Sequence, residues 1–192
     1  MRRFALAAAF CAALGARAQP RPAFIALPGG VAAITLPASM LDESAIRKQL
    51  NSGLTTVFLM IARERGTRNA GGARIEIRYD LWDEVWIVRK LEVDRKVEQQ
   101  RLANFDALVK WWRNPARIFV SGAGRVLLDV EMRVLPFSAA EEKDAREWIS
   151  KSGGVAAAGG GGGGGIVDAL IGTTITARPI TTYRWSGELM LK

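Results

Sequence analysis

The sequence predicts a mainly β protein with short helices, folded as a single-domain, antiparallel, immunoglobulin-like β-sandwich. Two stretches support this prediction, because apolar and charged residues alternate along them with the period of two that a half-buried strand requires. Their apolar members are Ile75, Ile77, Tyr79 and Leu81 in the first stretch, and Val126, Leu128, Val130, Met132 and Val134 in the second. A third stretch, residues 54–63 (LTTVFLMIAR), is apolar on both faces, which is typical of a central strand.

The first 18 residues have the features of a secretory signal peptide. Arg2 and Arg3 precede an apolar run over residues 4–14, which is too short to span a bilayer. The sequence Ala16-Arg17-Ala18 then supplies the small-x-small pattern that signal peptidases cleave. We therefore expect cleavage near Ala18 and a periplasmic or secreted mature protein that begins at Gln19.

Composition excludes several classes of enzyme. The 192 residues include no histidine, so a serine or cysteine nucleophile activated by histidine and a histidine-ligated metal are both ruled out. The one cysteine, Cys11, lies in the predicted signal peptide, which excludes an intrachain disulfide and a multi-cysteine metal site. We predict no catalytic, cofactor or metal site. The formal net charge of +8 favours an envelope protein, an anionic lipid or an acidic glycan as partner rather than nucleic acid.

The mature chain divides into a short leader and one domain. Residues 19–30 contain three prolines and end in Gly29-Gly30, and residues 31–192 form the β-rich domain with no further transmembrane segment. Further strands are expected at residues 31–36, 85–93, 118–120 and 181–191, and a glycine-containing turn at residues 66–72. The inward-facing residues are expected to be Val85, Ile87, Leu91 and Val93 in the strand at residues 85–93, and Tyr183, Trp185 and Leu189 in the last strand. Helices are expected at residues 42–50, capped by Ser39 or Asp42, at residues 102–112, and at residues 138–151, which open with a capping box.

A glycine-rich insert occupies residues 153–165, with seven consecutive glycines from Gly159 to Gly165. The run satisfies a glycine-rich phosphate-loop pattern trivially, but no Gly-Lys-Ser/Thr follows it. The insert is therefore predicted to be a flexible linker, since glycine loses the most backbone entropy on ordering.

The segment YDLWDEVW, residues 79–86, concentrates acidic and aromatic side chains. Asp80, Asp83 and Glu84 could perform acid–base chemistry or bind a cation such as calcium. The alternative is ordinary hairpin chemistry, because Asp83 and Glu84 lie where a turn between two strands favours acidic residues. Both interpretations remain open at this stage.

A second candidate surface lies near the end of the predicted helix at residues 102–112. Lys110, Trp111 and Arg113 combine an aromatic face with two cations, which suits a lipid headgroup or a glycan. Helical spacing assigns Trp112 to the apolar stripe and leaves Trp111 as the exposed ring. The alternative is that both tryptophans pack in the core. The nearby basic residues Arg89, Lys90, Arg95 and Lys96 alternate with acids and are read as a solvated strand face.

Three short motifs follow one another in an order that resembles an uncharacterised family. They are LNSGL at residues 50–54 with Phe58, YDLWDE at residues 79–84, and FDAL at residues 105–108. In this order they resemble a domain-of-unknown-function family of secreted bacterial proteins, over residues 41–136. The resemblance implies an envelope location and a β-rich domain, and it transfers no catalytic residue. The polyglycine insert departs from the family pattern.

These observations favour an exported, non-enzymatic envelope protein that acts as a binding or accessory module. Its candidate binding surface comprises Lys110, Trp111, Arg113, Asp83 and Glu84. One alternative is a histidine-free enzyme that acts on a cell-wall glycan through paired carboxylates. Another is a protein that binds anionic lipid or lipopolysaccharide through basic residues beside Trp111.

Overall fold

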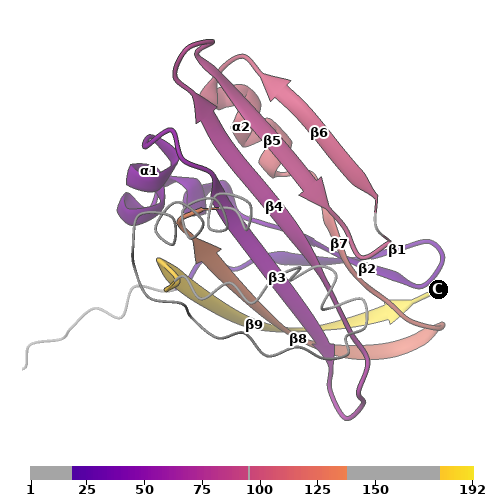
Figure 1. Ribbon diagram of the computed structural model, residues 1–192. Coiled ribbons are helices and arrows are strands. Elements are labelled where there is room, and N and C mark those ends of the chain that lie inside the picture. Colours follow the sequence, from indigo (N-terminus) through magenta and orange to yellow (C-terminus); the bar gives the residue numbers. More distant parts are fainter. Residues whose placement is uncertain (1–18, 95, 138–177) are drawn as a thin grey trace, which may run out of the picture.

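A computed structural model describes residues 19–94, 96–137 and 178–192, and in these residues it shows a mainly β protein with short helices (Figure 1). The strands are β1 (Ala23–Leu27), β2 (Val31–Thr35), β3 (Thr56–Glu64), β4 (Ala70–Asp80), β5 (Val85–Leu91), β6 (Val97–Leu102), β7 (Ala116–Val120), β8 (Gly124–Leu135) and β9 (Thr181–Leu191). The helices are a 3-10 helix η1 (Ala38–Asp42), α1 (Ser44–Leu50) and α2 (Phe105–Trp112).

The described strands form two antiparallel sheets. The large sheet has the order β6-β5-β4-β3-β8-β9, and the small sheet has the order β1-β2-β7. The predicted mainly β, antiparallel architecture is thereby confirmed. The immunoglobulin-like topology is not confirmed by this order, in which β3, β4, β5 and β6 are successive neighbours in a meander.

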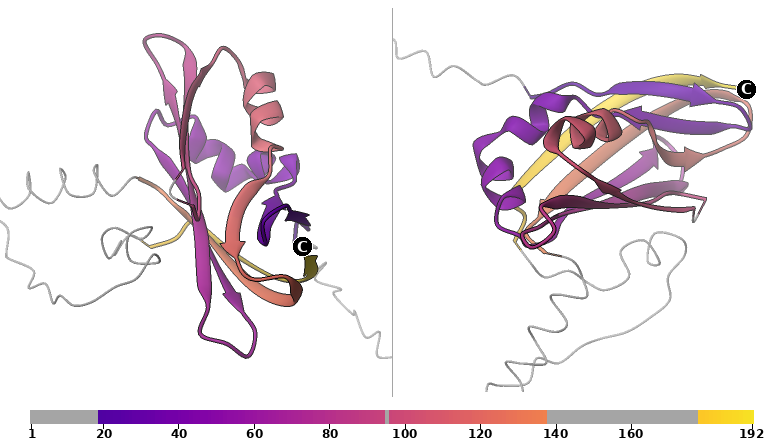
Figure 2. Two further views of the ribbon diagram at one scale, coloured as in Figure 1. Left: turned by 90° about the vertical axis from the view of Figure 1, so that its right-hand side faces the viewer. Right: turned by 90° about the horizontal axis from the view of Figure 1, so that it is seen from above.

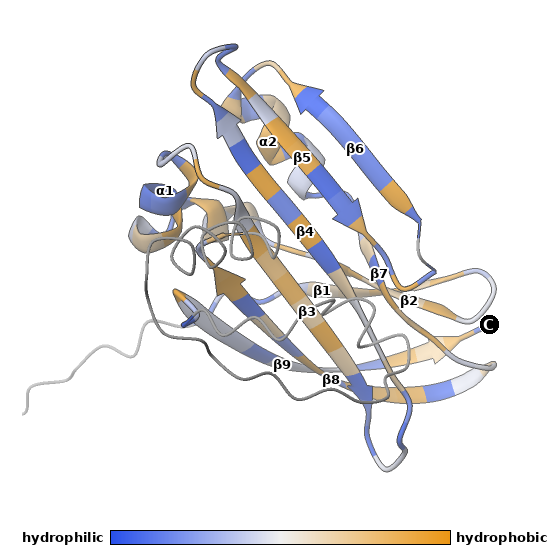
Figure 3. Ribbon diagram, viewed as in Figure 1, coloured by the Kyte–Doolittle hydropathy of each residue, from blue (hydrophilic) through white to orange (hydrophobic). Residues whose placement is uncertain are grey.

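One face of the large sheet carries the core. The helices and the small sheet lie on this inner face (Figure 2). Apolar and polar residues alternate along β4, whereas β3 is apolar along nearly its whole length (Figure 3). The core includes Phe58 of β3, whose ring meets that of Trp112 edge-on at a centroid distance of 4.7 Å. The prediction that residues 54–63 form a central strand is confirmed, because β3 pairs with both β4 and β8.

The small sheet meets the large sheet at two places. On one side, the ring of Phe24 in β1 lies over Gly187 of β9, so close that a Cβ on Gly187 would be 2.5 Å from a ring carbon. On the other side, β7 approaches β4, and a Cβ on Gly71 would lie 2.5 Å from the carbonyl oxygen of Ile118. Glycine is thus required where the two sheets come closest.

Two expectations about loops are wrong, each because the segment pairs as a strand. The turn predicted at residues 66–72 ends earlier, because Gly71 and Gly72 belong to β4 and permit its close approach to neighbouring backbone. The leader predicted at residues 19–30 contains strand β1, which pairs with β2 in register Ile25 to Ala33. Pairing along the backbone therefore overrides the local proline and glycine signals.

The inward face predicted for the strand at residues 85–93 is wrong at its start, whereas Val93, just beyond β5, is buried as predicted. Val85 and Ile87 were expected to point inward, but Trp86 and Val88 do so. Four residues, 81–84, connect β4 to β5, and this places Trp86 opposite Tyr79 on the same face. Leu81, expected to continue the inward face of β4, lies in this connection and is exposed.

Other predictions differ at helix starts and at one strand. The helix α1 begins at Ser44 with Glu43 as its N-cap residue, because residues 38–42 form η1 and place Ser39 and Asp42 inside that element. The side chain of Asn104 caps α2 by accepting the N–H of Ala107 at 2.9 Å. The polar strand β6 was not expected. Strand β9 has the predicted bounds. Of its predicted inward residues, Tyr183 and Leu189 are buried, and Trp185 is half-buried and packs against the core.

Several expected features lie outside the described residues. They are the signal peptide at residues 1–18, the helix at residues 138–151 and the glycine-rich insert at residues 153–165. Among the helices that the structure does describe, none has the length and hydropathy needed to cross a membrane.

Candidate functional site

The acidic segment forms the turn between β4 and β5. Oδ1 of Asp80 accepts hydrogen bonds from the N–H groups of Trp82 at 3.0 Å and Asp83 at 3.3 Å. These two donors hold the pKa of Asp80 below its ordinary value, with the Trp82 N–H as the larger cause. Glu84 closes the turn in the left-handed region at φ 53°, and Asp83 forms an ion pair with Arg101 of β6. The sequence thus builds a defined turn from side-chain caps and one unusual backbone angle.

A row of aromatic rings supports the base of this hairpin. The ring of Tyr79 lies 4.8 Å from that of Trp86 on the facing strand, measured between centroids. Trp86 in turn meets Phe105 of α2 at 5.9 Å, and the guanidinium carbon of Arg47 lies 3.8 Å above the Phe105 ring. The hairpin is therefore anchored to both α1 and α2 through aromatic and cation–π contacts.

Beyond this support the hairpin exposes apolar side chains. Trp82 is 96% exposed and Leu81 is 62% exposed, and Leu54 in the preceding loop is 50% exposed. The loop and the hairpin touch, because a Cβ on Gly53 would be 3.0 Å from Cδ1 of Leu81. We refer to Leu54, Leu81 and Trp82 as the apolar tip. Of the aromatic side chains that the structure describes, only that of Trp82 is exposed.

The turn does not bring its carboxylates together as a catalytic or cation-binding set. Asp80 is engaged by backbone N–H groups, Asp83 by Arg101, and Glu84 is exposed. Within the described residues, no three acidic or cysteine side chains are grouped so that they could hold a metal ion. The arrangement matches the hairpin interpretation of this segment, in which acidic residues serve the turn.

The expected surface around Trp111 lacks its aromatic ring. Trp111 is only 3% exposed, because its ring packs on Lys90 and its Nε1–H donates to Oε1 of Glu98 at 2.9 Å. The prediction of an exposed Trp111 is therefore wrong, and the alternative, in which Trp111 and Trp112 both pack in the core, is confirmed. Lys110 and Arg113 are exposed, but no ring lies exposed between them. The prediction that Lys90 belongs to a solvated strand face is also wrong, because Lys90 is buried on the inner face of β5.

Comparisons with known proteins identify no relative of this chain. The chain matches no family model, no curated protein and no solved structure. Any function must therefore be argued from the residues of this chain.

A cavity of about 510 Å³ lies where the start of the described chain meets η1 and β9. Asp42, Glu43 and Tyr183 contribute to its lining. The hydroxyl of Tyr183 donates to Oε2 of Glu43 at 2.6 Å, and Asp42 forms an ion pair with Arg47. Both carboxylates are thus already engaged by side chains of the protein, which favours a structural role for this corner.

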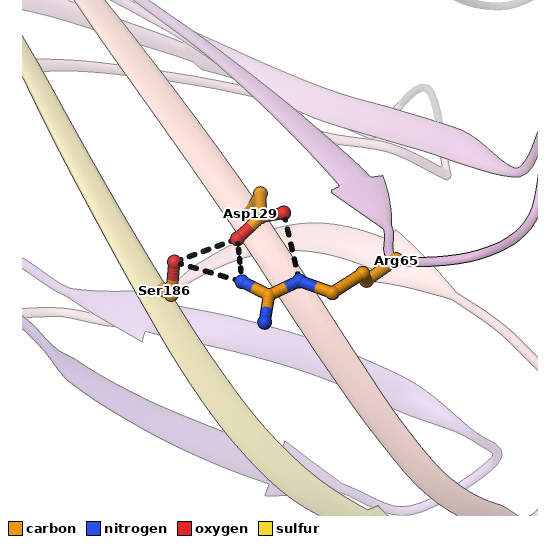
Figure 4. A network of polar contacts seen from close by, with 3 residues as sticks. All are labelled: Arg65, Asp129 and Ser186. Carbon is orange, nitrogen blue, oxygen red and sulfur yellow. Dashed lines mark hydrogen bonds and ion pairs between the residues drawn. The ribbon is translucent and has the colours of Figure 1, made fainter.

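The outer face of the large sheet carries a network of ion pairs over β3, β8 and β9. In Figure 4 the guanidinium of Arg65 donates two hydrogen bonds to the carboxylate of Asp129, at 2.6 and 3.2 Å. The hydroxyl of Ser186 donates to the same carboxylate at 2.6 Å. Beside it lies a cavity of about 290 Å³ lined by Arg63, Glu131 and other residues of β8 and β9. Most of these charges neutralise one another, so the surface is solvated rather than strongly charged.

The apolar tip is therefore the candidate functional site. Sequence reasoning placed Asp83 and Glu84 on this hairpin but missed Trp82 and Leu81 as its exposed members. The alternating pattern extends the strand through Leu81, because it does not show that the strand ends at Asp80 and that the turn spans residues 81–84. A signal was present, because an Asx turn at Asp80 predicts that the chain leaves the strand at that residue.

Proposed function

We propose that the protein is exported to the cell envelope and acts there as a non-enzymatic binding or accessory module that docks through the apolar tip. The observation that carries this proposal is the 96% exposure of Trp82 on an anchored hairpin. Tryptophan offers a large apolar area, and isolated exposed tryptophans on rigid elements are typical anchors of binding interfaces. The signal-peptide features of residues 1–18 support export.

The chemistry of the described residues supports binding more than catalysis. The chain has no histidine, and the carboxylates of the hairpin serve the turn rather than one another. The alternative of a carboxylate-dependent glycan enzyme thus gains no support from Asp80, Asp83 and Glu84. The alternative of a lipid binder loses the exposed Trp111 on which it rested.

Export is tested by isolating the protein from fractionated cells and determining its N-terminal residue. We expect a periplasmic or secreted protein that begins at Gln19. A protein that stays in the cytoplasm with the first 18 residues attached would overturn this part of the proposal.

Docking is tested by photo-crosslinking in the native bacterium. The full chain is produced with the photoreactive residue p-benzoylphenylalanine in place of Trp82, and with the same residue in place of Val120 as a control. Val120 is 48% exposed and lies far from the hairpin. Its neighbour Phe119 packs beside Gly71 at the start of β4, whereas the hairpin follows the end of that strand. We expect discrete adducts from position 82 only. No adduct from position 82, or equal adducts from both positions, would show that the tip is not a docking site.

A further inference from the structure

We infer that the partner of the apolar tip is a protein surface with one apolar pocket and basic side chains around it. This inference rests on the proposed function, because it assumes that the tip is a docking site. It adds the class of partner and the charge of the surface that receives Trp82.

The first argument is the rigidity of the tip. The Asp80 side chain fixes the N–H groups of Trp82 and Asp83, and Leu81 packs against Gly53. Below the turn, the Tyr79 and Trp86 rings hold the two strands together. A turn whose backbone is already fixed loses little conformational entropy on binding, so a single indole presented on it can serve as the anchor of a specific pocket.

The second argument is charge. Three carboxylates, those of Asp80, Asp83 and Glu84, lie in the same turn as the indole. Arg101 pairs with Asp83, and Arg78 and Arg101 both attract Asp80. None of the ion pairs among the described residues involves Glu84, so its negative charge is available to a partner. Glu84 is exposed and held in the left-handed region beside the tip. A partner that accepts Trp82 therefore meets negative charge at the edge of its pocket, and basic groups there complement it.

The same charges argue against a lipid surface as the partner. Proteins that lie on anionic membranes combine tryptophan or leucine with lysine and arginine, which bind the headgroups. Here Asp83 and Glu84 directly follow Trp82, so insertion of the indole would bring carboxylates to the headgroups. The tip is thus better suited to a basic protein surface.

The test uses the crosslinking chain with p-benzoylphenylalanine at position 82 and adds changes of charge. Glu84→Gln removes the carboxylate and Glu84→Lys reverses its charge. Ala123→Lys, at an exposed loop distant from the hairpin, raises the net charge by the same one unit as Glu84→Gln and is its matched control. Circular dichroism and thermal melting establish that each variant folds. If Glu84→Lys disturbs the left-handed turn, the inference is judged on Glu84→Gln, which keeps the length of the side chain.

We expect an adduct in which mass spectrometry finds peptides of a second protein. Loss of the charge attraction should make it about threefold weaker with Glu84→Gln and about tenfold weaker with Glu84→Lys, and leave it unchanged with Ala123→Lys. In parallel, the purified full chain is sedimented with vesicles of phosphatidylethanolamine and phosphatidylglycerol. We expect it to remain in the supernatant. Co-sedimentation that is lost with Trp82→Ala would overturn the inference in favour of a membrane. An adduct that both Glu84 variants leave unchanged or strengthen would overturn the basic surface. Either result leaves docking through the tip standing, whereas absence of any adduct removes the proposed function itself.

Discussion

The ammonium nitrogen of Lys90 lies 4.9 Å from the centre of the Trp111 ring, and both side chains are buried where β5 meets α2. Lys90 also donates to the carbonyl oxygen of Asn114 at 3.4 Å, just beyond the end of the helix. One cation thus joins the strand to the last turn of α2 through a ring and a carbonyl group. This contact explains why the Trp111 ring is buried between β5 and α2 and is absent from the exposed surface around Lys110 and Arg113.

Lys90→Met is expected to change how stability depends on pH. Burial lowers the pKa of Lys90, whereas in the unfolded chain the pKa is about 10.4. Between these two values the unfolded state binds more protons, so the free energy of unfolding of the wild type rises with pH. The variant lacks this contribution. Urea unfolding between pH 8 and pH 10.5 is expected to show the wild type gaining stability relative to Lys90→Met. Lys110→Met, which removes one exposed ammonium group, is the control for charge, and identical slopes for the wild type and Lys90→Met would contradict the prediction.

Tyr183→Phe is expected to destabilise the fold at pH 7 by about 1–2 kcal/mol, because Glu43 loses the hydroxyl that donates to it at 2.6 Å. Burial and this hydrogen bond raise the pKa of Tyr183. A raised pKa means that the contribution is fully present below the unfolded value of about 10 and is lost as pH rises above it. Urea unfolding at pH 7 and at pH 11 measures both effects. A difference between the wild type and the variant that stays constant, or that grows with pH, would show that the hydroxyl does not act in this way.

The antiparallel sheets could be predicted from particular residues. The alternation of Ile75 and Ile77 with charged neighbours, and that of Val126 to Val134, places one face of β4 and β8 in the core. This pattern depends only on the period of a strand and on burial of one face. Strand β6 could not be found in the same way, since its sequence VEQQRL is polar and its strand conformation depends on pairing with β5.

The candidate site was predictable only in part. Sequence placed acidic residues at a turn near Asp83 and Glu84, and the structure places them there. It did not separate the exposed Trp82 from the buried Trp111, because exposure is decided by which element packs on each ring. Lys90 and the β5–α2 contact bury Trp111, while the turn carries Trp82 beyond the last paired residues, Asp80 and Val85.

Asp80→Ala and Asp80→Asn form a matched pair for the turn. Alanine removes the acceptor of the Trp82 and Asp83 N–H groups, while asparagine keeps a side-chain oxygen at the same position. We expect Asp80→Ala to lower the melting temperature at pH 7 more than Asp80→Asn does. Because the pKa of Asp80 is lowered in the fold, the contribution of its charge is present above the unfolded value of about 3.9 and lost as pH falls through the folded value. The gap between the wild type and Asp80→Asn should therefore close at low pH in thermal melts, and a gap that widens there would contradict the prediction.

Gly71→Ala tests the contact that joins the two sheets. A Cβ at this position would lie 2.5 Å from the backbone oxygen of Ile118 and 3.2 Å from Cα of Phe119, so β4 and β7 would have to move apart. Backbone cannot yield by a change of rotamer, and overpacking of this kind costs about 1–3 kcal/mol.

Gly122→Ala is the control, because nothing lies within 4 Å of a Cβ at that position. Alanine there reduces the entropy of the unfolded chain, so its effect is expected to lie between zero and a gain of about 1 kcal/mol. Urea unfolding of both variants at one pH measures the contrast. Hydrogen exchange should, in addition, show faster exchange in Gly71→Ala at the N–H of Val93, which donates across the same junction to the carbonyl oxygen of Arg117 at 3.2 Å. Equal stability of the two variants would mean that the β4–β7 junction tolerates a side chain, and that Gly71 is not required by the close approach of the sheets.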